Sequence, residues 1–373
     1  MATEATKPET SSTEDSSTEG KSTEASHRPQ VSIVLPVFNG ADTLADTVAS
    51  ILAQTEPDWE LLIIDDGSHD RSRALAESMA AADGRIRVYA FANGGQAIAR
   101  NRGIDRARGN WIGFIDADDR WHPDKLRAQL AALAANPAAG WVYSWTQLTD
   151  DSGRAIGQPV TSPFSGWIYG PLLVTDFVSS GSNVLVSRSA LNQVGGFQPD
   201  LVPSEDWDLW LRLAWQFPAA QVPECHVFYR QRPTSSSENV WRQERVSRQI
   251  LQTAIARSPN QLTPHRAIIW GNRYKYLLFK ALDGPAQPRR AKTAARFAWQ
   301  VLQCHRGVLK QWPLVAQILL KMGLMGLPGA IGQRAIEQLG LQRIQDRILA
   351  LTLVPRFQEP IHCQLDRFDR PKG

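Results

Sequence analysis

The chain has 373 residues and a mass of 41.4 kDa, which is enough for one large α/β domain with an appendage. Hydrophobic residues make up 43% of it and charged residues 21%, a balance that excludes a chain disordered over most of its length. The three cysteines, Cys225, Cys304 and Cys363, lie far apart and form no CxxC pair, which excludes a disulfide framework or a cysteine-based zinc site.

Charge divides the sequence into two regions of opposite sign. Residues 29–229 hold 14 Lys or Arg and 23 Asp or Glu, a net charge of −9, whereas residues 230–373 hold 24 and 8, a net charge of +16. An acidic region suits metal binding, and a basic region suits an anionic surface such as lipid headgroups or a polyanion. A well-solvated helical face is an equally good explanation of the basic region.

The first 28 residues show no targeting pattern. They are rich in Ser, Thr and Glu, with six acidic residues, three basic residues and no apolar run, which is not the pattern of a signal peptide. We expect residues 1–28 to be a disordered tail, and we expect the protein to be cytoplasmic, either free or peripheral at the inner face of the membrane.

Apolar runs and helical periodicity alternate over the first third of the chain. Residues 31–39 form a nearly continuous β-branched run, typical of a buried parallel strand, before a predicted helix at 42–54 and a second buried strand at 60–66. The order of elements predicts an α/β fold with an open, doubly wound, mostly parallel sheet and helices on both faces. The elements that continue the pattern are a helix at 71–82, a strand at 86–89, a helix ending near 106 and a strand at 111–115.

The later part of the chain becomes helical. Strands are predicted at 140–145 and 182–187, and an aromatic-rich helix at 205–215. Residues 240–282 and 287–350 are predicted to be helices interrupted by prolines. The predicted domains are a tail at 1–28, an α/β domain at 29–230 and a basic, mainly helical C-terminal region at 231–373.

Carboxylates fall where ligands bind in such a sheet, beyond the carboxyl ends of the strands and at a helix start. Carboxylates that converge in a cleft repel one another unless a cation neutralises them, and oxygen ligands suit Mg²⁺ or Mn²⁺. A single Asp after a strand often only caps a helix, but the run Asp-Ala-Asp-Asp favours a metal site. The three groups are Asp65 with Asp66, Asp116 with Asp118 and Asp119, and Glu205 with Asp206.

Six motifs, in this order and spacing, resemble the family 2 glycosyltransferases, which have a GT-A fold: VSIVLPVFN, IIDDGS, GGQAIARNRGI, FIDADD, VGGF and EDWDLWLRL. The resemblance covers about residues 30–230. It implies a nucleotide-sugar donor, with a UDP-sugar favoured, an Mg²⁺ or Mn²⁺ cofactor and a reaction that inverts the anomeric centre.

The resemblance gives donor and metal roles to residues of the first four motifs. Asp66 matches the carboxylate that hydrogen-bonds the base, which is chemically sensible because a carboxylate accepts from an imide N–H. Asp116 and Asp118 match the D-x-D motif, with Asp118 the direct metal ligand and Asp116 a ligand of both donor and metal. The other donor-binding matches are Pro36, Val37, Phe38, Arg100 and Asn101. For the last two, a surface arginine with a capping asparagine is the structural alternative.

The last two motifs supply the catalytic and acceptor side. Asp206 matches the base that deprotonates the acceptor hydroxyl opposite the leaving diphosphate, in a single in-line displacement. Glu205 is expected to orient the acceptor, Gly196 to let the backbone approach a substrate closely, and Trp207 to stack on a sugar. Each of these three also has a purely structural interpretation, as a helix start, a tight turn and a core residue.

Two absences and two alternatives bear on the function. The sequence has no Q-x-x-R-W motif and no run of transmembrane helices, which favours single addition over processive synthesis. A nucleotidyltransferase would need a basic, glycine-rich phosphate loop after the first strand, and Phe38 to Asp42 contains no basic residue. A non-catalytic sugar-nucleotide-binding protein would be expected to have lost some carboxylates, and all are present.

The expected acceptor is a saccharide or a lipid-linked saccharide of cell-envelope polysaccharide or glycolipid biosynthesis, with no nucleic-acid partner. Residues 308–331 are predicted to form an amphipathic helix with one polar stripe of Lys310, Gln317 and Lys321. Together with the basic residues Arg289, Lys292 and Arg296, this helix suits peripheral attachment to an anionic membrane face. The alternative is a helical bundle that packs internally or against a second subunit of a homo-oligomer.

Overall fold

The computed structural model describes residues 28–232, 239–257, 262–344 and 347. The predicted tail, apart from Arg28, lies outside the described residues, as does Cys363.

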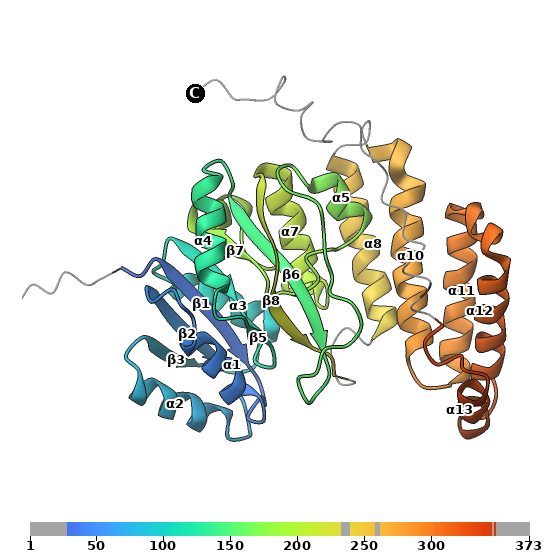
Figure 1. Cartoon of the computed structure of the whole chain (residues 1–373), viewed down its shortest axis with the longest axis horizontal. Coiled ribbons are helices and arrows are strands. Elements are labelled where there is room, and N and C mark those ends of the chain that lie inside the picture. The colour runs from blue at the N-terminus through green and yellow to red at the C-terminus, as the bar shows by residue number, and fades with distance from the viewer. Residues whose placement is uncertain (1–27, 233–238, 258–261, 345–346, 348–373) are drawn as a thin grey trace, which may run out of the picture.

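Eight strands form one mixed sheet, in the order β3-β2-β1-β4-β7-β6-β8-β5 (Figure 1). The strands β3, β2, β1 and β4 are parallel to their neighbours in this group, β7 runs antiparallel to both of its neighbours, and β8 is parallel to β6. This arrangement confirms the predicted open α/β sheet. The strands are β1 (Val31–Val37), β2 (Trp59–Asp65), β3 (Ile86–Ala90), β4 (Trp111–Phe114), β5 (Arg120–Trp121), β6 (Trp141–Thr149), β7 (Leu185–Ser187) and β8 (Ala219–Arg230).

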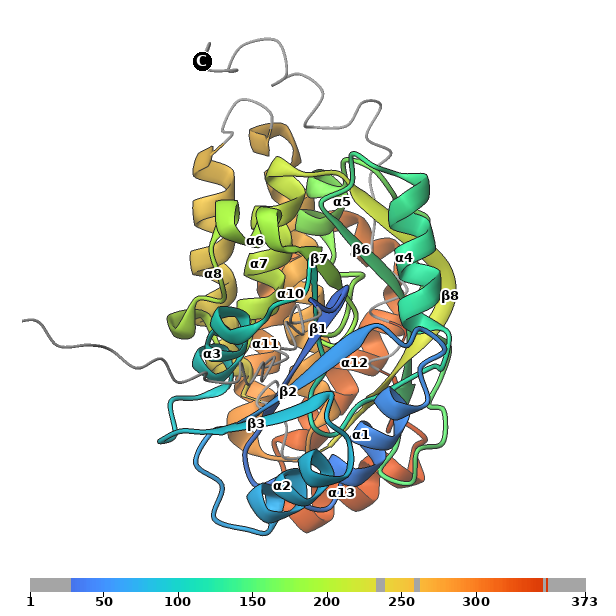
Figure 2. The same cartoon turned by 90° about the vertical axis from the view of Figure 1, so that its left-hand side faces the viewer.

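Helices cover both faces of the sheet, as Figure 2 shows with α3 and α7 on one side and α1 and α4 on the other. In β1, Val34 packs into one hydrophobic core, whereas Ile33 and Leu35 pack into the second core on the opposite face. Because both faces are buried, the strand is a continuous apolar run. The helices of this domain are α1 (Leu44–Leu52), α2 (Ser72–Ala82), α3 (Gln96–Arg106), α4 (Lys125–Ala135), α5 (Tyr169–Val174), α6 (Arg188–Val194) and α7 (Glu205–Gln216), with a short 3-10 helix η1 (Pro199–Leu201).

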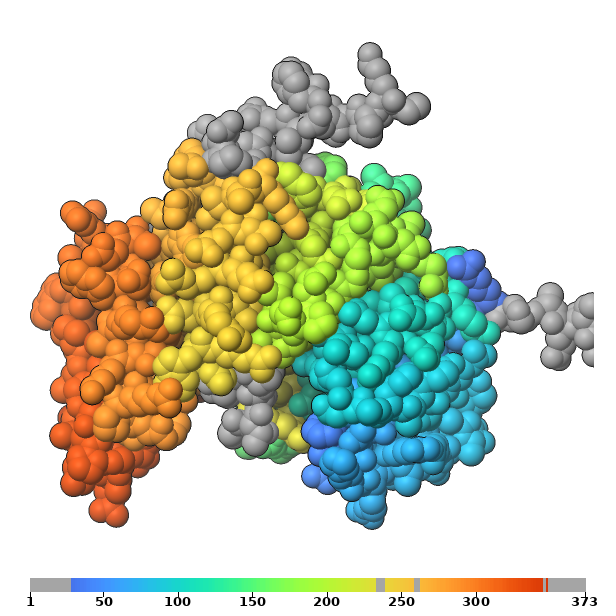
Figure 3. Space-filling view, turned by 180° about the vertical axis from the view of Figure 1, so that it is seen from behind, coloured from blue at the N-terminus to red at the C-terminus, as the bar shows by residue number. Residues whose placement is uncertain are grey.

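The C-terminal region is helical, as predicted, and packs against the sheet domain over a continuous surface (Figure 3). Apolar residues of α8, including Ile250 and Leu251, belong to the core of the sheet domain, whereas α10 to α13 share a third core around Phe297. The elements are α8 (Val240–Arg257), η3 (Thr263–His265), α10 (Arg266–Asp283), α11 (Pro288–Cys304), η4 (Arg306–Gln311), α12 (Trp312–Met325) and α13 (Gly329–Gln338).

The predicted amphipathic helix at 308–331 is not one helix. The 3-10 helix η4 ends at Gln311, α12 begins at Trp312 with Pro313 in its first turn, and α13 begins at Gly329. Proline fits this position because a first-turn N–H has no partner within the helix. Lys321 is buried and donates from Nζ to the carbonyl oxygen of Gln342 at 2.9 Å, so the predicted polar stripe does not form. Within the described residues, no helix has the length and apolar character to cross a bilayer.

A close contact between α3 and β1 places the helix that carries two of the predicted donor-site residues. A Cβ atom added at Gly103 would lie 2.3 Å from Cγ1 and 2.9 Å from Cγ2 of Val34. Branching at Cβ restricts the χ1 rotation of valine, and Cβ of Val34 itself would lie only 3.1 Å away, so the side chain cannot easily turn away. The absence of a side chain at residue 103 therefore sets how closely α3 approaches the sheet.

We predict that Gly103→Ala lowers the free energy of unfolding by about 1–3 kcal/mol, because overpacking must be relieved by shifting the helix. Gly323→Ala is the matched control, since a Cβ added there meets no atom within 4 Å. In that exposed helical position alanine is favoured over glycine by up to about 1 kcal/mol. Thermal or urea unfolding of the two variants checks this, and equal losses of stability would contradict it.

Candidate active site

A cleft of about 1350 Å³ opens at the carboxyl ends of β1, β2 and β4 and extends to the start of α7. The sequence motifs thus converge on the place where an open α/β sheet binds ligands. Asn101 and Gly196 do not line the cleft. The predicted site residues that do are Pro36, Val37, Phe38, Asp66, Arg100, Asp116, Asp118, Glu205, Asp206 and Trp207.

The two D-x-D carboxylates differ in their partners. Asp116 accepts hydrogen bonds through Oδ1 from Nε2 of Gln96 at 3.0 Å and from Nη2 of Arg100 at 2.6 Å. The Asp118 carboxylate makes no hydrogen bond with any described residue and lines the cleft. Burial and the nearby charge of Asp116 raise the pKa of Asp118 to about 6. A carboxylate in this position has its oxygens available for a ligand.

Asp119 stabilises the loop between β4 and β5 and does not line the cleft. It is fully buried and accepts hydrogen bonds from the Ser182 hydroxyl and, at 3.0 Å, from the backbone N–H of Arg230. Burial first, and then the charges of Asp118 and Asp116, raise its pKa well above the ordinary value. Asp119 therefore fixes the loop that presents Asp118 to the cleft.

The carboxylates fit a hard divalent cation that keeps substrate oxygens in its coordination sphere. Across the part of the chain that the structure describes, no three His, Cys, Asp or Glu side chains converge to hold a metal by themselves. Mg²⁺ and similar ions are usually held by one or two carboxylates together with substrate phosphates and water. Burial first, and then the charge of Asp116, raise the pKa of Asp118, and a bound cation would stabilise the charged form of both carboxylates.

Arg100 is a buried ion-pair centre between the two halves of the cleft. Its side chain is 2% exposed and donates to Asp116 at 2.6 Å and to Glu205 at 2.8 Å. Burial raises the pKa of Glu205 to about 7 although Arg100 opposes that shift. With both carboxylates on its guanidinium, Arg100 joins the end of β4 to the start of α7, and the predicted contact with a donor phosphate remains a prediction.

Asp206 lies in the first turn of α7 and lines the cleft. Its Oδ1 accepts a hydrogen bond from the backbone N–H of Trp207 at 2.7 Å. Burial raises the pKa of Asp206, against the charge of Arg100 and this N–H. Nothing in the sequence indicates a role for Asp176, which follows α5 and lines the same cleft. Burial and the charge of Asp206 raise the pKa of Asp176 to about 7.

Asn101 and Gly196 form a structural clamp outside the cleft. The Asn101 side chain donates to the carbonyl oxygen of Phe197 and accepts from its N–H, both at 2.8 Å. A Cβ atom at Gly196 would lie 2.4 Å from Oδ1 of Asn101, so only glycine admits this pair of hydrogen bonds. Arg212 donates to the carbonyl oxygens of Val194, Gly195 and Gly196 on the other side. The turn before α7 is thus tied to α3.

The end of the cleft that we expect to bind the nucleoside holds residues 36–38 and Asp66. The Asp66 carboxylate accepts hydrogen bonds from the backbone N–H groups of Gly94 and Gly95 and from Nη1 of Arg102, at distances of 2.7 to 3.1 Å. These bonds use most of its acceptor capacity. The structure thus gives Asp66 the task of holding the glycine loop, and its predicted contact with a base remains a prediction.

Further cleft residues come from beyond the motifs. Tyr229 lies near the end of β8, and Arg232 follows that strand. The positive charge of Arg232 opposes the upward shift of the pKa of Asp118. Arg273 and Tyr276 belong to α10, in the C-terminal region. Their spacing of three residues places them on one helix face, but nothing in the sequence shows that this face meets the sheet domain.

Comparison with known proteins defines the class as glycosyltransferase. The sequence profile described as Glycosyl transferase family 2 matches residues 32–195. A putative teichuronic acid biosynthesis glycosyltransferase of Bacillus subtilis, TuaG, is 32% identical over 58% of this chain and 84% of its own length. The chain therefore belongs to glycosyl transferase family 2.

Two further similarities complete the comparison. The Escherichia coli protein WfgD, a UDP-Glc:alpha-D-GlcNAc-diphosphoundecaprenol beta-1,3-glucosyltransferase, is 31% identical over 49% of this chain and 69% of its own length. A structure of S. aureus TarS in complex with UDP-GlcNAc aligns with a TM-score of 0.49 and 14% identity, covering 76% of this chain and 91% of that chain.

We predict opposite stability effects at the two adjacent aspartates. Asp119→Ala leaves the N–H of Arg230 and the Ser182 hydroxyl without their acceptor and should cost about 1–3 kcal/mol for each buried group. Asp118→Ala removes no hydrogen bond and should be at least as stable as the wild type at pH 7.

The pH dependence follows from the raised pKa of Asp118. A folded-state pKa of about 6, above the ordinary 3.8, means that the contribution of Asp118 to the free energy of unfolding falls as pH rises through this interval. Relative to Asp118→Ala, the metal-free wild type should therefore lose stability between about pH 4 and pH 6. Urea unfolding in the presence of a chelator measures this difference, and a difference that is constant with pH would contradict the assignment.

Proposed function

We propose that this enzyme transfers a sugar from a nucleotide-diphosphate sugar, with a UDP-sugar favoured, to an acceptor hydroxyl, with inversion and one sugar per reaction. The observation that supports this is that Asp116 and Asp118, which follow β4, line a single cleft together with Asp206, in the first turn of α7. The first two carboxylates suit a metal diphosphate, and Asp206 suits a base. An in-line displacement needs these two functions on opposite sides of the anomeric carbon.

Asp118 and Asp116 would hold Mg²⁺ or Mn²⁺ together with the donor diphosphate. When bound, the ion acts as a Lewis acid that stabilises the charge on the leaving diphosphate. Arg232 is a second positive charge close enough to Asp118 to lower its pKa, and we infer that it also faces the diphosphate. Residues 36–38 at the end of β1 bind the nucleoside.

Asp206 accepts the proton of the acceptor hydroxyl. Its pKa is raised by burial, and a base is most effective when its pKa lies nearer to the working pH. Glu205 is tied to Arg100 and holds the start of α7 in place, so its contribution to the acceptor side is to orient. No covalent intermediate is required, because a single displacement inverts the anomeric centre.

The names of the relatives support the acceptor class. The Escherichia coli relative acts on a diphosphoundecaprenol-linked sugar, and the Bacillus subtilis relative is assigned to teichuronic acid biosynthesis. We infer a saccharide or lipid-linked acceptor in cell-envelope polysaccharide or glycolipid biosynthesis. Family membership argues against the nucleotidyltransferase alternative. The intact set of carboxylates argues against a protein that only binds sugar nucleotides, and nucleic acid is not among the inferred partners.

We predict that Asp206→Asn retains donor affinity and loses transfer by on the order of 10²–10⁴-fold, because an amide cannot accept the proton. A screen of UDP-sugars with Mn²⁺, followed by product detection on saccharide acceptors, measures kcat and the donor KM. Asp105→Asn, an exposed aspartate on α3, is the control. Unchanged transfer with weakened donor binding would place the base elsewhere.

The outer helices of the C-terminal region present apolar side chains to solvent. Although α10 to α13 share an internal core, as the bundle alternative requires, Trp312 is 71% exposed and Ile331 is 60% exposed. Residues 284–344 contain nine Lys or Arg and one Glu. Exposed aromatic and aliphatic residues among positive charges suit an anionic bilayer surface, so we propose that this region attaches the enzyme peripherally to the membrane that carries its acceptor.

We predict that the purified protein floats with phosphatidylglycerol vesicles at low salt and not with phosphatidylcholine vesicles. The double variant Trp312→Ser with Leu319→Ser should lose this binding, whereas Leu52→Ser, at an exposed leucine on α1, should keep it. Wild-type protein that stays unbound but sediments as a concentration-dependent dimer would instead assign the surface to a homo-oligomer.

A further inference from the structure

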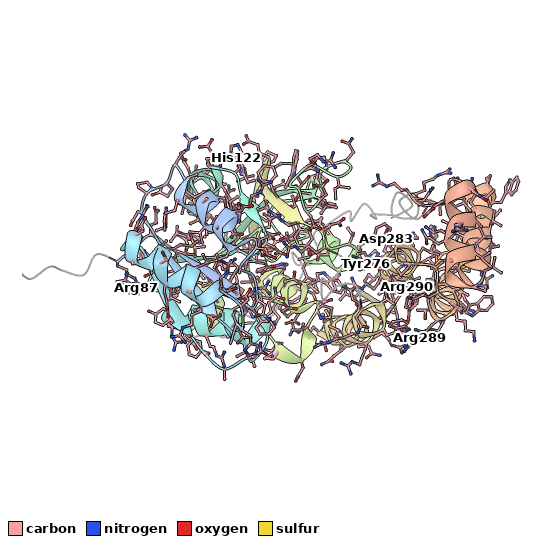
Figure 4. The ribbon with its side chains drawn as sticks, turned by 90° about the horizontal axis from the view of Figure 1, so that it is seen from below. Arg87, His122, Tyr276, Asp283, Arg289 and Arg290 are labelled. Atoms are coloured by element: carbon pink, nitrogen blue, oxygen red, sulfur yellow. The ribbon has the colours of Figure 1, made fainter. Side chains whose placement is uncertain are left out.

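Helix α10 forms a wall of the catalytic cleft. Figure 4 shows Tyr276, Asp283 and Arg290 where the C-terminal helices meet the sheet domain. Arg290 donates to the carbonyl oxygens of Lys280 and Ala281 and so closes the end of α10. The residues of α10 that line the cleft are Asn272, Arg273, Tyr276, Phe279, Lys280 and Asp283.

The Arg273 side chain is held in one position. Its guanidinium carbon lies 4.9 Å from the ring centre of Trp207 and 4.7 Å from that of Tyr276. Nε donates to the Ser247 hydroxyl at 2.6 Å, and Nη2 donates to Oε1 of Gln243 at 3.2 Å. Two aromatic rings and two hydrogen bonds to α8 thus fix a guanidinium that would otherwise be flexible.

One side of this guanidinium is left for a ligand. Among the described residues, Nη1 of Arg273 has no hydrogen-bond or ion-pair partner, although the residue lines the cleft. Burial lowers the pKa of Arg273, and the charges of Asp176 and Asp206 favour its protonated form without forming an ion pair with it. A partly buried guanidinium with spare donors is stabilised by an anion in the cleft.

The position of Arg273 indicates the acceptor rather than the donor. Its ring contacts and hydrogen bonds involve α7, α8 and α10, and none involves residues 36–38 or the D-x-D loop. Trp207, on which it stacks, directly follows Asp206, the proposed base. The acceptor hydroxyl reaches the base from the side opposite the diphosphate, so a group bound at Arg273 belongs to the acceptor.

We propose that Arg273 binds an anionic group of the acceptor saccharide, either a phosphate or a uronate carboxylate, next to the hydroxyl that receives the sugar. This inference rests on the proposed function and adds the substrate class to it. Trp207 is 3% exposed and packs into the core, whereas Tyr276 is partly exposed, lines the cleft beside Arg273 and is the aromatic residue suited to contact a sugar ring. The basic helical region thereby contributes one wall of the active site as well as an outer surface.

The test measures binding of lipid-free probes with UDP and Mn²⁺ present to fill the donor side. The probes are GlcNAc 1-phosphate, the methyl glycoside of glucuronic acid and the neutral methyl glycoside of GlcNAc. We expect one of the anionic probes to bind the wild type roughly 10-fold or more tightly than the neutral probe, in line with a charge-assisted hydrogen bond. Which of the two does so distinguishes phosphate from carboxylate.

Variants separate this role from a structural one. Arg273→Met should abolish the preference for the anionic probe and leave UDP binding unchanged, and Arg273→Lys, which keeps the charge, should retain part of it. Arg245→Met, at an exposed arginine on α8, should behave as the wild type. The inference is overturned if neither anionic probe binds more tightly than the neutral one, or if a folded Arg273→Met or Arg273→Gln keeps the preference. Loss of UDP binding in the wild type would instead count against the proposed function.

Discussion

The buried guanidinium of Arg100 holds the catalytic cleft together, because it pairs with Asp116 at the end of β4 and with Glu205 at the start of α7. Without the guanidinium between them, these largely buried carboxylates and Asp206 would repel one another. Removing one partner of a buried ion pair leaves an uncompensated charge, which is far more costly than losing a surface pair. The distance between the D-x-D loop and the proposed base is thus set by a residue that need not touch a substrate.

Other motif residues also support the cleft without facing its interior. Asp119 accepts a hydrogen bond from the backbone of Arg230 and so fixes the loop in which Asp118 faces the cleft. Asn101 donates to the backbone of Phe197 and so fixes the turn before α7. Asp66 organises the glycine loop at the other end of the cleft. A family motif therefore includes residues that shape the site along with residues that bind, and their hydrogen-bond partners distinguish the two groups.

The sequence was sufficient for the first half of the sheet and for the place of the site. Strands such as β1 are buried on both faces and so are continuous apolar runs, and the carboxylates that follow them fall at one edge of a parallel sheet. It was not sufficient for β8, whose Pro223 and Glu224 interrupt the apolar pattern and whose pairing with β6 shifts register. The sequence also could not predict that α10, which carries Arg273, forms a wall of the cleft. Helical periodicity shows which residues share a helix face, but it does not show what that face packs against. For the same reason, the sequence could not predict that α8 packs into the core of the sheet domain while α10 to α13 form a separate core.

The proposed function depends most on the joint binding of a divalent cation and a nucleoside diphosphate in the cleft. Two carboxylates, with no third side-chain ligand among the residues that the structure describes, should bind such an ion weakly alone and tightly when phosphate oxygens complete its coordination. Free Mn²⁺ measured by electron paramagnetic resonance during titration of the full chain, with and without UDP, tests this directly. We predict weak Mn²⁺ binding without UDP and much tighter binding with it, with the increase lost in Asp118→Ala. Tight Mn²⁺ binding in the absence of UDP, or an affinity that UDP does not change, would contradict the account.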